Sequence, residues 1–64
     1  MFEVRHEDDA WDLGVLHTAG HVEGCPLLLG VPTHLVESFE HGQHDHAALS
    51  EARVDVLAAM WGVD

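Results

Sequence analysis

The chain has 64 residues, of which 12 are Asp or Glu, two are Arg and none is Lys, so its formal net charge is −10 at pH 7. This charge excludes direct binding to nucleic acid or to an anionic membrane surface, because proteins hold both through Lys and Arg side chains. A hydrophobic fraction of 47% is too high for a disordered acidic tail, and the length fits one small domain over residues 1–64.

The N-terminal part of the chain is predicted to form two strands joined by an acidic turn. Apolar and polar residues alternate over residues 1–6 and again over residues 11–18, with the period of a half-buried strand. Residues 7–10 are rich in Asp, which favours turns because its side chain bonds to nearby backbone groups. A helix that starts at Asp9 is the alternative for the second stretch. The strand is favoured, because Gly14 would cost such a helix ~1 kcal/mol relative to Ala.

Two further segments are predicted to be strands. Residues 27–31 are apolar on both faces, as in a central strand or a strand at an interface. Residues 33–40 alternate like a strand, although one helical turn capped by Thr33 fits them as well. Recurring β-branched and aromatic residues and the early break at Gly42 favour the strand. Residues 41–44 are then predicted to be a loop.

The clearest element is an amphipathic helix after Asp45. The apolar residues expected on its buried face recur at helical spacing: Leu49, Ala52, Val56, Leu57 and Met60. Asp45 or Ser50 can cap its N-terminus, and Gly62 can end it in the left-handed conformation. Glu51 would lie near the positive end of the helix dipole.

Together these elements predict an α+β fold, in which a small antiparallel sheet of three or four strands carries one C-terminal helix on one face. The side chains expected to form its core are Phe2, Val4, Trp11, Leu13, Val15, Leu28, Leu35, Leu57, Met60 and Trp61. The other face of the sheet should be polar or covered by a partner.

The acidic residues are the most informative functional feature. The densest cluster comprises Glu7, Asp8, Asp9 and Asp12, and a smaller group comprises Glu37 and Glu40. Alternate residues of a strand lie ~6.7 Å apart on one face, close to the spacing of successive phosphates along a nucleic-acid strand. We therefore predict that these residues form a surface that binds a basic, nucleic-acid-binding groove of a partner protein.

In its short length, its abundance of Asp and Glu and its lack of catalytic motifs, the chain resembles small acidic inhibitors encoded by phages and mobile elements, notably anti-CRISPR proteins and other DNA mimics. The resemblance implies blockade of a nucleic-acid-binding effector by occupation of its basic groove. We expect no enzymatic activity, no catalytic residue and no cofactor, and we favour a monomer.

Cysteine content and hydropathy favour a cytoplasmic protein. Cys25 is the sole cysteine, whereas small secreted domains usually carry several. No basic region precedes a long apolar stretch, so no signal peptide is expected. The longest apolar run, residues 27–31, is too short to cross a bilayer.

Two other functional classes remain open. The chain has seven His residues, and the densest group, His41, His44 and His46 with Asp45 beside them, could make a metal-binding protein. A structural zinc site, however, wants four ligands and commonly thiolates. Alternatively, the strand over residues 27–31 could pair with a copy of itself in a structural subunit.

Because histidine titrates near pH 6.5, binding that depends on charge should weaken between about pH 7 and 5.5.

Overall fold

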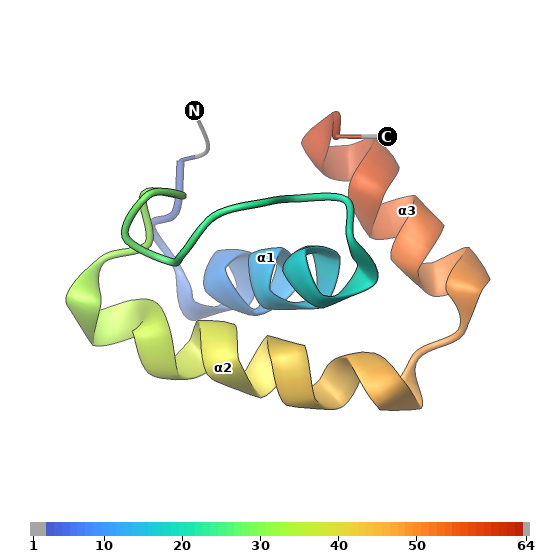
Figure 1. The fold of residues 1–64 in the computed structure, drawn as a ribbon, viewed down its shortest axis with the longest axis horizontal. Coiled ribbons are helices and arrows are strands. Elements are labelled where there is room, and N and C mark those ends of the chain that lie inside the picture. Colours follow the sequence, from blue (N-terminus) through green and yellow to red (C-terminus); the bar gives the residue numbers. More distant parts are fainter. Residues whose placement is uncertain (1–2, 64) are drawn as a thin grey trace.

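The computed structural model describes residues 3–63, and their regular structure is entirely helical (Figure 1). The elements are α1 (Glu7–Ala19), α2 (Val36–Asp45) and α3 (Glu51–Trp61), with short 3₁₀ turns at Thr33–Leu35 and His46–Ala48. No strand occurs within residues 3–63. The predicted α+β fold with an antiparallel sheet is therefore wrong, and of the predicted elements the C-terminal helix is confirmed.

Helix α1 begins in the acidic run that the sequence predicts as a turn. His6 caps the helix, because its ring Nδ1 accepts a hydrogen bond of 3.2 Å from the backbone N–H of Asp8. Glu7, Asp8 and Asp9 occupy the first turn, where carboxylates stabilise the positive end of the helix dipole. The predicted turn over these residues and the strand predicted over residues 11–18 are both wrong, because an Asp-rich run also starts helices well.

Helices α1 and α2 cross with their backbones in close contact, and glycine permits this contact. A Cβ atom at Gly14 would overlap the carbonyl oxygen of Phe39 and lie 2.9 Å from its carbonyl carbon. A Cβ atom at Gly42 would meet the carbonyl group of Trp11 in the same way. Each helix therefore needs a residue without a side chain at the crossing. The strand and loop predicted over residues 33–44 are wrong, because Gly42 lies inside a helix and does not break it.

The two crossing helices run in the same direction, and a long connection leads from the end of α1 back to the start of α2, along the side of α1 away from α2 (Figure 1). Gly20 ends α1 in the left-handed conformation, with φ of 88°. Residues 20–32 then lead back to the start of α2, and Val22, Leu29 and Val31 of this segment are buried in the core. Short loops make neighbouring helices antiparallel, so the length of this connection is what allows α1 and α2 to be parallel.

Residues 26–30 form a turn, and the central strand predicted over residues 27–31 is wrong. Backbone hydrogen bonds close the turn, among them one of 3.0 Å from the Val31 N–H to the Pro26 carbonyl. Val31 is 2% exposed, whereas Leu27 and Leu28 are 72% and 74% exposed. The pairing of this segment as a strand with a second copy therefore lacks its structural basis.

Helix α3 has the caps that the sequence predicts. Ser50 Oγ accepts a hydrogen bond of 3.2 Å from the Arg53 N–H, and Gly62 ends the helix with φ of 72°. Its buried face is centred on Val54 and Ala58. Three residues expected on that face are exposed: Ala52, Val56 and Met60. The helix is apolar almost all around, so periodicity alone does not determine which side is buried.

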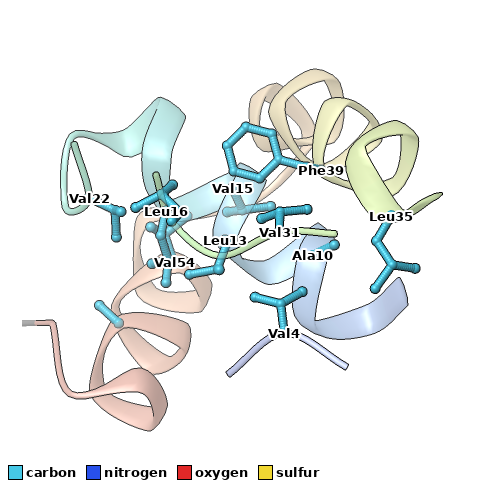
Figure 2. Packing of buried hydrophobic residues seen from close by; sticks show 12 residues of the cluster. Val4, Ala10, Leu13, Val15, Leu16, Val22, Val31, Leu35, Phe39 and Val54 are labelled. Carbon is cyan, nitrogen blue, oxygen red and sulfur yellow. The ribbon is translucent and has the colours of Figure 1, made fainter. Parts of the chain in front are cut away.

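The core lies where α1 meets α2, α3 and the return connection (Figure 2). Phe39 of α2, at 1% exposure, and three residues of α1 are its largest fully buried side chains: Leu13, Val15 and Leu16. Among the predicted core residues, Val4, Leu13, Val15 and Leu35 are buried, and Trp11, Leu57 and Trp61 are partly buried. The prediction that Leu28 and Met60 belong to the core is wrong, because both are exposed. Phe2 lies outside the described residues. Residues 3–5 have no regular structure, so the strand predicted over residues 1–6 is wrong where the structure describes it.

Candidate functional site

A groove of about 510 Å³ lies between α1 and α2, and its wall is rich in carboxylates. Glu7 and Asp8 come from the first turn of α1, Glu37 from the first turn of α2, and Asp45 from the end of α2. Because the two helices are parallel, their acidic first turns lie at the same end of the pair (Figure 1). No Arg or Lys lines this acidic groove.

The α2 side of the acidic groove is a row of side chains four residues apart. Glu37, His41 and Asp45 share one face of the helix for this reason. The Glu37 carboxylate lies 3.7 Å from His41 Nε2. Asp45 accepts a hydrogen bond of 2.9 Å from the indole Nε1 of Trp11, which also lines the groove. This bond fixes the Asp45 carboxylate between the two helices.

The carboxylates of the acidic groove have little charge compensation. The side chains of Asp8 and Glu37 are 90% and 88% exposed. Within residues 3–63, the one ion pair between Arg and a carboxylate joins Arg5 to Glu3 at 3.5 Å, outside the groove. The groove therefore attracts cations, and added salt should screen the attraction.

Three of the six predicted binding residues line the acidic groove, and three do not. Glu7, Asp8 and Glu37 are brought together, whereas Asp9, Asp12 and Glu40 lie elsewhere. Asp9 Oδ2 accepts a hydrogen bond of 3.4 Å from the Arg5 N–H, and Glu40 borders an apolar hollow on α2. The predicted spacing of alternate residues along a strand is wrong, because residues two apart on a helix point to different sides.

Asp12 links α1 to α3. Its Oδ2 accepts a hydrogen bond of 3.3 Å from the indole Nε1 of Trp61, and its side chain is half-buried. Burial raises the pKa of the Asp12 carboxyl above its ordinary value of 3.8, the hydrogen bond from Trp61 opposes this rise, and the charges of Asp9 and Asp8 add to it. Asp12 is therefore a structural carboxylate at a helix interface.

The histidines proposed as metal ligands are not gathered into one site. His41 lies beside Glu37, and His44 Nδ1 lies 3.8 Å from Asp45 Oδ1. His46 lines a separate hollow of about 330 Å³ between the end of α1 and the start of α3. Within residues 3–63, no group of three His, Cys, Asp or Glu residues is arranged to hold a metal ion. The metal-binding alternative thus has no geometric support in this part of the chain.

Sequence reasoning did not assign six other residues of the acidic groove to the binding surface: Trp11, His34, Leu35, Ser38, His41 and Asp45. The spacing of Glu37, His41 and Asp45 would have placed Asp45 on the same face once this segment was recognised as a helix. Trp11 was predicted for the core, and no local signal shows that its indole also meets Asp45.

None of the helices in residues 3–63 combines the length and the apolar character that crossing a bilayer requires. Comparisons of the chain with models of protein families, with curated proteins and with solved structures found no significant match. The chemistry of the acidic groove is therefore the basis for assigning a function.

Proposed function

We propose that the protein is an acidic interaction module, whose acidic groove binds a basic surface of a nucleic-acid-binding protein and blocks it. The supporting observation is that parallel packing gathers four carboxylates into one groove that no Arg or Lys lines. Such a cluster attracts Lys and Arg side chains and speeds their encounter at low salt. The side chains that grip phosphates are of this kind, so the groove would compete with nucleic acid for them.

The dimensions of the acidic groove suit a short row of cationic side chains. Glu37 and Asp45 are eight residues apart on one face of α2, ~12 Å along the helix axis, and Glu7 and Asp8 come from the neighbouring helix. Carboxylates pair with guanidinium groups through two parallel hydrogen bonds. Trp11 lines the same groove, and an indole attracts cations to its face.

Inhibition of this kind works by occupancy, as in the anti-CRISPR proteins and DNA mimics that the composition resembles. We place it in the cytoplasm, because Cys25 is an exposed free thiol and reducing compartments keep thiols unpaired. A monomer suits this function, since a net charge of −10 opposes self-association.

Neutralising two groove carboxylates tests the proposal. The double variant Glu7→Gln/Glu37→Gln removes two charges from the acidic groove, and Glu23→Gln/Asp55→Asn removes two from exposed positions outside it. Calorimetry with a synthetic oligolysine should show about tenfold weaker binding for the groove variant, because two exposed ion pairs contribute ~0.7 kcal/mol each. The control variant should bind nearly as well as the wild type. Equal weakening in both variants would show that net charge alone matters.

Affinity capture then tests the class of partner. Wild-type protein and both double variants serve as baits for a host-cell lysate, with washes of rising salt concentration. We expect the wild type and the control to retain nucleic-acid-binding proteins that elute at moderate salt, and the groove variant to lose them. Recovery of no such protein, or equal recovery by all three baits, contradicts the proposal.

A further inference from the structure

An apolar hollow of about 550 Å³ shares Glu37 with the acidic groove. Leu27 and Cys25 of the return connection form one side of it, and Val36 in the first turn of α2 forms another. Glu37 and Glu40 add two carboxylates to its lining. Apolar and acidic surface therefore adjoin at the start of α2.

The apolar side of this hollow is held outward by the fold. The turn that carries Leu27 is closed by the hydrogen bond from the Val31 N–H to the Pro26 carbonyl, and Val31 anchors it in the core at 2% exposure. Leu27 therefore lies on the outer side of the turn, where it is 72% exposed. When a partner covers an apolar side chain that is held in water, the free energy of the complex is lowered.

We infer that the apolar hollow receives an apolar side chain of the same basic partner, so that the partner segment carries Lys or Arg beside a leucine-like anchor. This inference rests on the proposed function of the acidic groove. The carboxylates of Glu37 and Glu40 favour an occupant that brings positive charge with its apolar anchor.

A second copy of the chain is a poor occupant of the apolar hollow. It would bring its own surplus of carboxylates, from a chain of net charge −10, against Glu37 and Glu40. Its cations are Arg5, which pairs with Glu3 at 3.5 Å, and Arg53. Charge therefore selects a basic partner.

Two synthetic helical peptides of equal length and charge test this inference. One combines lysines with leucines spaced three and four residues apart, and the other has serines in place of the leucines. The wild type should bind the Lys–Leu peptide about tenfold more tightly, as burial of one leucine side chain would give. Leu27→Ser should abolish this preference without weakening the Lys–Ser peptide. Met60→Ser removes an equally exposed apolar side chain, 72% exposed, from α3 and should keep the preference.

Cys25 provides a second readout, because it is the sole cysteine, is exposed and lines the apolar hollow. Saturating Lys–Leu peptide should slow the alkylation of Cys25 by a maleimide severalfold. The Lys–Ser peptide, bound to the same degree, should leave the rate unchanged.

The outcomes separate this inference from the proposed function. Equal affinity for both peptides, with binding still dependent on Glu7 and Glu37, would overturn the role of the apolar hollow and leave the acidic groove standing. Failure of both peptides to bind would overturn both. If Leu27→Ser and Met60→Ser weaken the preference for the Lys–Leu peptide equally, the inference is overturned. It is also overturned if light scattering detects a dimer that Leu27→Ser dissociates.

Discussion

Replacing Gly42 by alanine should destabilise the protein, although alanine is the better helix former. In an exposed helix this substitution stabilises by ~1 kcal/mol. In α2 the added Cβ would overlap the carbonyl oxygen of Trp11 and lie 2.9 Å from its carbonyl carbon. Both atoms belong to the backbone of α1, so no side-chain rotation can relieve the overlap.

The size of the effect follows from these two opposing contributions. Relief requires the helices to separate by about 1 Å, and overpacking of this severity costs ~3 kcal/mol. Subtracting the helix-propensity gain leaves a loss of ~2 kcal/mol, from a total of ~3–10 kcal/mol for a chain of this length. The melting temperature should then fall by ~8–16 °C.

Gly14→Ala should behave in the same way, because its Cβ would overlap the carbonyl oxygen of Phe39. The double variant with Gly42→Ala provides a stricter test. One separation of α1 from α2 relieves both overlaps, so the double variant should lose less than the sum of the single losses. If the two substitutions instead caused independent local defects, their losses of unfolding free energy would add.

Thermal and urea unfolding, followed by far-UV circular dichroism, measures these losses. Ala52→Gly on the exposed side of α3 sets the scale of helix propensity in this protein and should lower the unfolding free energy by ~1 kcal/mol. If Gly42→Ala raises the melting temperature by as much as Ala52→Gly lowers it, the helices do not meet at Gly42. The acidic groove that their crossing creates would then be wrong as well.

Two further substitutions test the interfaces and caps of α1 and α3. Asp12→Asn should raise the melting temperature at pH 7, because burial raises the pKa of Asp12 and the folded state favours the neutral form. The stability that Asp12 contributes is present below pH 3.8 and is lost as the pH rises through its folded pKa. The advantage of Asn should therefore vanish as the pH falls toward 3.8. A stabilisation by Asn that does not depend on pH would contradict this explanation. Ser50→Ala should cost ~1 kcal/mol in urea unfolding, because the Arg53 N–H loses its acceptor, whereas an unchanged stability would show that the cap contributes nothing.

The C-terminal helix could be predicted because the signals at its ends are local. Ser50 needs only the backbone three residues ahead, and Gly62 needs only its own left-handed conformation. The side that faces the core could not be predicted, because Val56 and Met60 fit a helical stripe as well as Val54 and Ala58 do. Contact with α1 decides between the two, and that contact is not encoded in the local pattern.

Helices α1 and α2 could not be recognised because the cost of a glycine is local and its benefit is remote. Gly14 costs ~1 kcal/mol of helix propensity, which is visible in the sequence. Phe39, which Gly14 contacts, lies 25 residues later in the chain, and the contact becomes apparent only when both segments are helical. Leu13 and Leu16 beside it are fully buried, and each contributes ~1.5–3 kcal/mol. Burial therefore outweighs propensity at this crossing.

Three of the four carboxylates that line the acidic groove could be predicted from the sequence, because charge clustering alone singles out Glu7, Asp8 and Glu37. Their union in one groove depends on the parallel direction of α1 and α2, and so on the long return through residues 20–32. A short loop would have made the helices antiparallel and placed their acidic first turns at opposite ends.

Helix stability accounts for the acidic first turns, but it does not account for Asp45. Glu7, Asp8 and Glu37 lie at helix N-termini, where the dipole favours carboxylates whether or not a partner binds. Asp45 is the last residue of α2, where the same dipole disfavours a negative charge. Its hydrogen bond with Trp11 does not require the charge, since the amide oxygen of an Asn would accept the same N–H. The negative charge of Asp45 thus works against its own helix and adds to the attraction of the groove for cations. It is the carboxylate of the groove that folding explains least, and the proposed function would give its charge a role.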